Sequence, residues 1–249
     1  QGLHPRPRRS PAPRAGLALR CQRMPAIQVA PSILSADFTR LADEIASVER
    51  AGADVLHVDV MDGHFVPNLT FGPPVIAQLR KLTRLPFDVH LMIEDAERWV
   101  RAYRDAGADW ISVHVEAVPH LHRTLQVIRE SGAAPGVAIN PGTALTSIED
   151  ALPYCHHVLL MSVNPGFGGQ GFIAESVDKA RRLSGWIRER GLKTLIEMDG
   201  GLAPATVREP VQAGVSVVVA GSAVLGETDR RAAIERLRGR LRGGALAGT

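Results

Sequence analysis

The stretch Leu56-His57-Val58-Asp59-Val60-Met61-Asp62-Gly63 combines a buried strand with polar side chains. Its apolar and β-branched residues predict a β-strand, and Asp62-Gly63 marks the turn that ends it. Successive side chains of a strand point to opposite faces, so His57 and Asp59 share one face. Burying these two groups costs free energy unless they are satisfied, either as a core histidine with a helix-capping aspartate or as ligands of a metal ion.

The same pattern of a short apolar run, a turn and an amphipathic segment repeats along the chain. Eight runs are predicted to be strands, at 27–34, 55–60, 87–93, 110–115, 136–139, 157–163, 194–198 and 215–219. Apolar strands that alternate with helices are typical of a parallel sheet, and eight units of about 30 residues predict an α/β fold, the (β/α)₈ TIM barrel. An open doubly wound sheet is the alternative, but the first strand lacks the GxGxxG turn that such sheets use for dinucleotides.

The composition indicates one globular domain. The chain has 249 residues, of which 45% are hydrophobic and 22% are charged, and α/β barrels often have this length. No apolar run approaches the ~20 residues that span a bilayer, which argues against a membrane protein. The two cysteines, Cys21 and Cys155, are too few for a disulfide framework or a cysteine-ligated metal site, and they favour a reducing compartment.

Residues 1–23 differ in composition from the rest. They contain six arginines and no acidic residue, so leaving them out changes the formal net charge from +3 to −3. The acidic body has no basic stripe with interleaved aromatics, which argues against a nucleic-acid partner. We expect residues 1–25 to be a disordered leader, 26–243 to be the barrel and 244–249 to be a flexible tail.

The leader has two interpretations. It is either a transit peptide for a plastid or another organelle, or a segment upstream of a true start at Met24. Transit peptides are usually rich in serine, and Ser10 alone supplies a hydroxyl here. The second interpretation is therefore favoured, and with it a cytoplasmic protein.

Polar residues gather at the carboxyl ends of the predicted strands, where the active sites of TIM barrels lie. His57 and Asp59 belong to the second strand, His90 to the third and Asp199 to the seventh. Each alone is more often a core or surface residue, but their common position favours convergence on one metal ion. Mixed nitrogen and oxygen ligands suit Zn²⁺, Fe²⁺, Mn²⁺ or Co²⁺ rather than Ca²⁺.

Glycine-rich turns follow the last three predicted strands. They contain Gly168-Gly169, Gly200-Gly201 and Gly221-Ser222. Glycine allows backbone N–H groups to approach an anion, and TIM barrels often bind phosphate at the loops after strands seven and eight. Tight turns without a ligand are the alternative, but three such pairs on adjacent strands favour a phosphate.

A metal, a phosphate and two carboxylates together suggest proton transfer next to a carbonyl group. Asp59 and Asp199 lie on strands two and seven, so one can take a proton and the other can return one from the opposite face. Such a sequence of steps inverts a carbon centre. Met61, Met92 and Met161 near strand ends either cap a dry reaction site or pack in the core.

Six motifs occur in succession. They are Pro31-Ser32-Ile33-Leu34-Ser35-Ala36-Asp37-Phe38, His57-Val58-Asp59-Val60-Met61-Asp62-Gly63, Asp88-Val89-His90-Leu91-Met92, Asn164-Pro165-Gly166-Phe167-Gly168-Gly169-Gln170, Asp199-Gly200-Gly201 and Ala220-Gly221-Ser222. With these motifs in the family's order, the chain from about Ile27 to Gly226 resembles ribulose-phosphate 3-epimerases.

The resemblance implies an isomerase of the pentose phosphate pathway that interconverts D-ribulose 5-phosphate and D-xylulose 5-phosphate. It implies one divalent metal per subunit, Zn²⁺ as first choice, on His57, Asp59, His90 and Asp199. Asp59 would accept the proton and Asp199 would donate one. The substrate would contact Ser32, His90, Gly166, Phe167, Gly168, Gly169, Gly200, Gly201, Gly221 and Ser222. The family also implies a homo-oligomer.

Three residues depart from the family's pattern: His64, Met198 and Leu225. His64 stands where arginine is usual, which leaves the fine substrate preference open. Two alternatives to the pentulose-phosphate epimerase therefore remain. One is a 3-epimerase of a hexulose 6-phosphate such as allulose 6-phosphate, and the other is a phosphosugar-binding barrel without catalysis, which the pair of opposed aspartates argues against.

Overall fold

The computed structural model describes residues 27–242 of the chain. The predicted leader at 1–25 and the predicted tail at 244–249 lie outside the described residues. Within the described part, no helix is long and apolar enough to cross a membrane.

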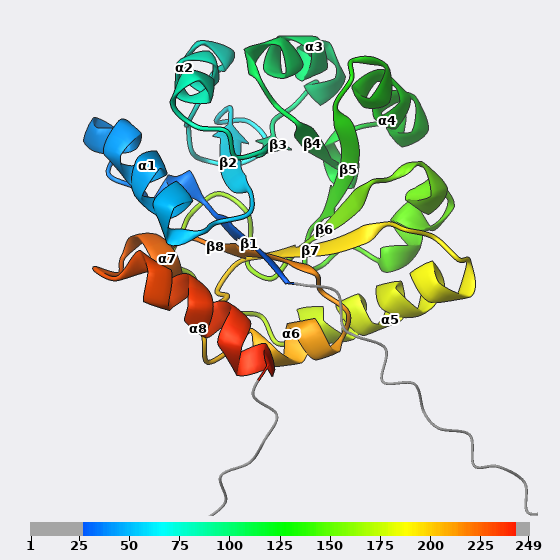
Figure 1. The fold of residues 1–249 in the computed structure, drawn as a ribbon. Helices are drawn as coiled ribbons and strands as arrows, with labels where there is room; N and C mark the ends of the chain where they lie inside the picture. The colour runs from blue at the N-terminus through cyan, green and yellow to red at the C-terminus, as the bar shows by residue number, and fades with distance from the viewer. Residues whose placement is uncertain (1–26, 243–249) are drawn as a thin grey trace, which may run out of the picture.

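Eight parallel strands form a single sheet that curves into a barrel (Figure 1). The strands are β1 Gln28–Pro31, β2 Leu56–Met61, β3 Phe87–Met92, β4 Trp110–His114, β5 Ala134–Ile139, β6 His157–Met161, β7 Leu195–Asp199 and β8 Val217–Ala220. The hydrogen-bonded order runs from β1 through β8 and β7 back to β2. The predicted (β/α)₈ TIM barrel is therefore confirmed.

The barrel closes between its first two strands. Ser32 and His57 form an isolated parallel bridge, and the N–H of Asp54 donates to the carbonyl of Val29 at 3.1 Å. The carboxylate of Asp54 in turn accepts a hydrogen bond from the N–H of Val29 at 2.8 Å. Closure removes the free strand edges and brings β1 beside β2 at the end of the barrel that carries the polar residues.

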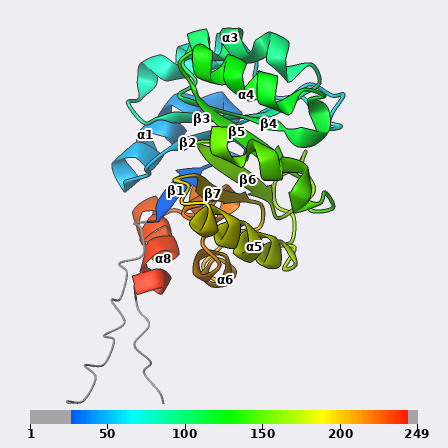
Figure 2. The same ribbon diagram turned by 90° about the vertical axis from the view of Figure 1, so that its right-hand side faces the viewer.

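Helices surround the sheet, with α3 and α4 on one side and α5 and α6 on the other (Figure 2). They are α1 Leu41–Ala51, α2 Pro73–Leu79, α3 Ala96–Ala106, α4 Leu121–Glu130, α5 Ser176–Glu189, α6 Arg208–Gln212, α7 Ser222–Leu225 and α8 Arg230–Arg242. After β5 the connection is instead a 3₁₀ helix, Leu145–Tyr154. Pro153 lies inside that segment and lacks the N–H that a regular helix needs.

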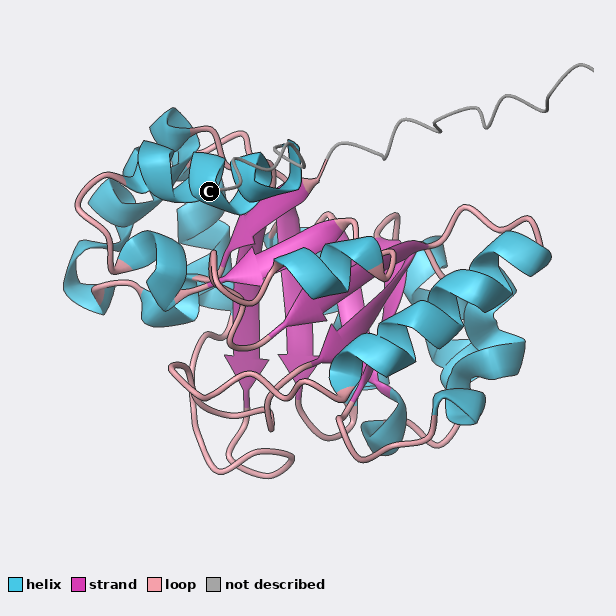
Figure 3. Ribbon diagram, turned by 90° about the horizontal axis from the view of Figure 1, so that it is seen from below, coloured by secondary structure: helices cyan, strands magenta, loops and turns pink. Residues whose placement is uncertain are grey.

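Alternation along the strands separates two environments. On β2, Val58 and Val60 face the helices and belong to the main apolar core. Their neighbours His57 and Asp59 face the interior of the barrel and are buried there. Figure 3 shows the strand arrowheads pointing toward the end where the long loops gather. The polar interior positions near this end build the site described next.

Candidate active site

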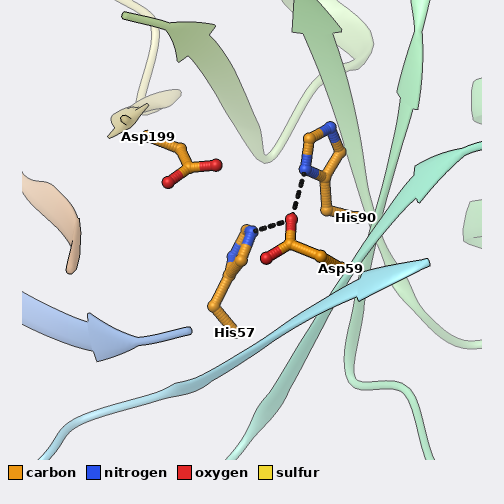
Figure 4. Close-up of side chains that lie close together, drawn as sticks. All are labelled: His57, Asp59, His90 and Asp199. Atoms are coloured by element: carbon orange, nitrogen blue, oxygen red, sulfur yellow. Dashed lines mark hydrogen bonds and ion pairs between the residues drawn. The ribbon is translucent and has the colours of Figure 1, made fainter. Parts of the chain in front are cut away.

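Four side chains from three strands meet at the carboxyl end of the barrel (Figure 4). Each of His57, Asp59, His90 and Asp199 offers a ligand atom, and these atoms all lie within 4.8 Å of one another. Oδ1 of Asp59 lies 3.3 Å from Nε2 of His57 and 3.1 Å from Nδ1 of His90. The arrangement matches the group that the sequence predicted for a metal.

Strand register brings these residues together. Asp59 on β2 pairs with His90 on β3, so alternation directs both side chains into the barrel at the same height. Asp199 is the last residue of β7 and pairs with Met161 of β6. Its carboxylate therefore approaches the group from the other side of the barrel, as Figure 4 shows.

One ring nitrogen of His57 is hydrogen-bonded to Asp88, and the other faces this group of ligand atoms. Its Nδ1 donates to Oδ2 of Asp88 at 2.6 Å, while Nε2 is buried and has no hydrogen-bond partner among the described residues. Burial lowers the pKa of His57, but the charges of Asp59 and Asp88 outweigh it and raise this pKa well above its usual value. The space between His57 and Asp59 thus favours a positive charge, either a proton or a metal ion.

The pKa values of the two carboxyl groups in the site are shifted in opposite directions. Burial raises the pKa of Asp59, but the charge of His57 and the nearby ring nitrogens of His57 and His90, at 3.3 and 3.1 Å, outweigh it and hold this pKa well below its usual range. At Asp199, burial and the negative charge of Asp59 act together and raise the pKa to about 7. Paired groups with pKa values pushed apart are suited to separate acid and base roles.

A cavity of about 340 Å³ opens beside this group. Both proposed catalytic aspartates line it. So do eight of the residues predicted to contact the substrate: Ser32, Phe167, Gly168, Gly169, Gly200, Gly201, Gly221 and Ser222. His57 and His90 do not line it. Gly166 also stays outside the lining, and its carbonyl accepts a hydrogen bond from Nδ2 of Asn68 at 2.9 Å.

The glycine turns around the cavity lie close to neighbouring loops. A Cβ on Gly200 would come within 2.5 Å of Val163, and a Cβ on Gly201 would come within 2.7 Å of the backbone of Phe172. Both residues also have positive φ angles, 118° and 65°. Glycine is therefore required here by space and by conformation, which lets the loops after β6 and β7 pack together.

The cavity offers backbone groups rather than cationic side chains. Among the described residues, none that lines it is Lys or Arg. Ser222 and Ala223 line it at the first turn of α7, where helix geometry leaves backbone N–H groups without intrahelical partners. An anion in this cavity would therefore rely on N–H and hydroxyl donors.

The residues that depart from the family's pattern lie away from the cavity. His64 is exposed and its Nδ1 approaches the carbonyl of Asp62 at 3.1 Å. Met198 and Leu225 are buried in the main apolar core. None of the three lines the cavity, so none alters its wall directly.

The methionines near the strand ends pack rather than face the cavity. Met61 and Met92 form a small cluster with Val66, and Met161 belongs to another with Leu159. None of the three methionines lines the cavity. Core packing, one of the two interpretations offered above, describes these contacts.

Three buried polar residues below the site were not assigned a role from the sequence: Asp88, Glu197 and His157. Nε2 of His157 lies 3.7 Å from a carboxylate oxygen of each of the other two. Burial and the charge of Asp88 raise the pKa of Glu197 well above its usual value. Asp88 and Glu197 each precede a proposed metal ligand by two residues, and that period-two spacing was the available signal.

Comparisons with known proteins identify the family of this chain. The model of the ribulose-phosphate 3 epimerase family matches residues 28–225. A ribulose-phosphate 3-epimerase of Bacillus subtilis is 52% identical over 214 residues, covering 86% of this chain and 99% of its own. One from Synechocystis is 54% identical over 214 residues (85% and 93%), and the chloroplastic ribulose-5-phosphate-3-epimerase of Arabidopsis thaliana is 49% identical over 223 residues (89% and 79%).

Solved structures show the same fold at low identity. A 3-hexulose-6-phosphate synthase superposes with a TM-score of 0.61 at 21% identity, covering 86% of this chain and 98% of that one. KGPDC from Streptococcus mutans gives a TM-score of 0.65 at 16% identity, covering 88% and 98%. The family match and the close sequence relatives go further than the fold. This chain belongs to the ribulose-phosphate 3-epimerase family and is an isomerase that acts on carbohydrates.

Proposed function

We propose that this epimerase inverts C3 of D-ribulose 5-phosphate to give D-xylulose 5-phosphate, reversibly, with a divalent metal and two carboxylates. The observation that carries the proposal is the convergence of Asp59 and Asp199 from β2 and β7 on one buried centre beside the cavity. Two carboxylates on opposite sides of a carbon can remove a proton from one face and return one to the other. A protein that only binds a phosphosugar has no need of this pair.

In this proposal Asp59 removes the C3 proton and Asp199 donates a proton from the opposite face. Their roles exchange in the reverse direction. Oγ of Ser32 donates a hydrogen bond to Oδ2 of Asp59 at 2.6 Å and thereby orients the carboxylate. The hydroxyl of Ser162 donates to the carbonyls of Asp199 and Gly200 at 2.9 and 2.7 Å, which fixes the end of β7.

The residues present fit a divalent cation. Nε2 of His57 lacks a hydrogen-bond partner in the described part of the chain, and the four ligand atoms combine two imidazoles with two carboxylates. This donor set suits Zn²⁺, the first choice, as well as Fe²⁺, Mn²⁺ or Co²⁺. Such an ion, held by these four residues, would supply positive charge that stabilises negative charge developing on a substrate oxygen.

The phosphate would lie among the late loops. The cavity is lined by Gly168-Gly169, Gly200-Gly201, Gly221 and Ser222. Their backbone donors would bind the phosphate and position C3 between the aspartates. This substrate places the enzyme in the pentose phosphate pathway, and we expect it to act there as a homo-oligomer in the cytoplasm.

Turnover before and after metal removal tests the proposal. Dialysis against a chelator should abolish epimerisation of ribulose 5-phosphate, and Zn²⁺ or Fe²⁺ should restore it. Full activity in protein shown by elemental analysis to hold no transition metal would contradict the metal requirement.

Substrate length is tested in the same assay. We expect kcat/KM for ribulose 5-phosphate to exceed that for allulose 6-phosphate by about tenfold or more, since one extra carbon in a closed pocket typically costs a factor of 10–200. A preference for the hexulose would move the assignment to a hexulose-6-phosphate epimerase.

A further inference from the structure

A chain of three side chains leads away from the proposed metal centre through β4. Nε2 of His90 lies 2.8 Å from Nε2 of His114, the last residue of β4. Nδ1 of His114 lies 3.1 Å from Oε2 of Glu116, in the short 3₁₀ turn Val115–Ala117 that follows. Both histidines are fully buried, and neither His114 nor Glu116 lines the cavity, so this chain cannot act by touching the substrate there.

Glu116 is held firmly at the far end of the chain. Its Oε1 accepts a hydrogen bond from the N–H of Asn140 at 2.9 Å, and the hydroxyl of Thr143 also bonds its carboxylate. Nζ of Lys179 on α5 donates to the carbonyls of Asn140, Pro141 and Thr143 at 2.8, 2.9 and 2.8 Å. The lysine thus fixes the loop after β5, and its charge lies close to the carboxylate of Glu116.

The carboxylate of Glu116 determines which ring nitrogen of His114 and of His90 carries a proton. Burial raises the pKa of Glu116, but hydrogen bonds from His114 and Thr143 outweigh it and lower the pKa to about 2, so the carboxylate only accepts. Nδ1 of His114 must then carry the proton, which leaves its Nε2 as an acceptor for the Nε2–H of His90. Nδ1 of His90 consequently carries no proton, and its lone pair faces Oδ1 of Asp59 at 3.1 Å.

The opposite order of protons is disfavoured. If Nδ1 of His90 carried the proton, Nε2 of His114 would have to donate and its Nδ1 would face the carboxylate of Glu116 without a proton. Two acceptors at 3.1 Å in a buried site repel each other. In the favoured order the facing acceptors are instead Nδ1 of His90 and Oδ1 of Asp59, and there a bound metal ion would offset the repulsion. Among the described residues, no candidate metal site lies between His114 and Glu116. Packing supports the same geometry, because the ring of Phe65 lies 4.6 Å from that of His114 and restricts its rotation.

We propose that His114 and Glu116 are positioning residues that fix the tautomer and the ring orientation of His90, so that its Nδ1 is available to a metal ion. The inference rests on the metal site of the proposed function. His57 has a matching support on the other side, where its Nδ1 donates to Asp88. Removing such a supporting partner typically weakens metal binding by about 10–100-fold.

Metal affinity tests this inference with a readout independent of activity. The Kd for Zn²⁺ is measured by competition with a chromophoric chelator for the wild type and for the variants Glu116→Ala, Glu116→Gln and His114→Phe. We expect Glu116→Ala and His114→Phe to raise Kd about 10–100-fold. Glu116→Gln, whose amide oxygen still accepts from His114, should raise it by less. At saturating Zn²⁺ the variants should regain much of their kcat.

Glu97→Ala is the matched control. Glu97 is a carboxylate on α3 that accepts hydrogen bonds from Arg123 and Thr124 at 3.0 Å and has no hydrogen bond to His114. Its removal should leave the Zn²⁺ affinity unchanged. Circular dichroism of each variant identifies a loss of folding, and Glu116→Gln preserves the volume and shape of the site if the smaller side chain unfolds it.

The tautomers themselves are visible in proton–nitrogen correlation spectra of protein labelled with ¹⁵N-histidine. We expect His90 to carry its proton on Nε2 and His114 on Nδ1. Two results would overturn the positioning role alone: equal Zn²⁺ affinity in the wild type and all three variants, or His90 protonated on Nδ1 in the Zn²⁺ form. Wild-type protein without any Zn²⁺ site would instead overturn the metal of the proposed function.

Discussion

In the proposed mechanism, proton transfer depends on the carboxyl groups of Asp59 and Asp199. We expect Asp59→Asn and Asp199→Asn to lower kcat by about 10²–10⁴-fold, the usual contribution of a positioned acid or base. The amide has nearly the same shape but cannot take up or release the proton. Steady-state kinetics with ribulose 5-phosphate measure the loss, and Asp43→Asn, an exposed residue of α1, serves as the control.

Either aspartate variant with a normal rate, after mass spectrometry has excluded reversion by deamidation, would contradict the roles proposed here. The binding of phosphate should survive both changes, because the glycine loops remain. A variant that loses phosphate binding as well would indicate a collapsed site rather than a missing acid or base.

The sequence predicted individual residues best where alternation along one strand was enough. His57 and Asp59 were placed on one face from their spacing within a strand, and the structure brings them together with His90 and Asp199. The support of His90 by His114 and Glu116 could not be predicted in this way. It depends on which strand lies beside which and on the loop after β5, and spacing within one strand contains neither.

Among the elements, α8 has a side-chain contact that ties it to the start of the barrel. Arg230 donates to Oε2 of Glu44 on α1 at 2.6 Å, and both side chains are mostly buried, with 17% and 14% exposed. We expect Arg230→Ala to lower the free energy of unfolding by about 1.5–3 kcal/mol, the range for a hydrogen bond to a charged group. Thermal denaturation measures the change.

Arg236→Ala is the comparison for this prediction. Arg236 pairs with Glu227 at 2.8 Å, but both side chains are nearly half exposed. An exposed pair contributes little, so its loss should change stability by less than about 1 kcal/mol. Equal effects of the two substitutions would show that burial of the Arg230 pair does not matter.

Helices and strands could be told apart because the spacing of apolar residues agreed with the turn-forming residues that end each element. The Ala-Gly-Ala pattern at 51–53 and at 106–108 predicts two helix ends, and α1 and α3 end there with Gly52 and Gly107 in left-handed conformations. The sequence pattern predicts a helix over 204–213, but α6 covers only Arg208–Gln212. The four-residue helix α7 was missed, because so short a segment has no measurable period.

On the scale of the whole molecule, eight repeats of one unit made the barrel predictable, since each unit need only pack on its neighbours. The assembly of several barrels stays a prediction. Phe38, Leu69 and Val75 are large apolar side chains that remain 48%, 72% and 40% exposed. We expect light scattering after gel filtration to give a mass above the 26.8 kDa of one chain. The mass of a single chain at micromolar concentration would contradict the predicted homo-oligomer.

In the proposed mechanism two carboxylates exchange the proton at C3 with solvent, and proton NMR of D-ribulose 5-phosphate in D₂O measures this exchange directly. We expect xylulose 5-phosphate to appear with deuterium at C3 and the C3 proton signal of both sugars to disappear as the reaction proceeds. Neither change should occur after metal removal. Xylulose 5-phosphate that forms while its C3 proton is retained would contradict this mechanism, since the carbon would then have been inverted without passing its proton to Asp59.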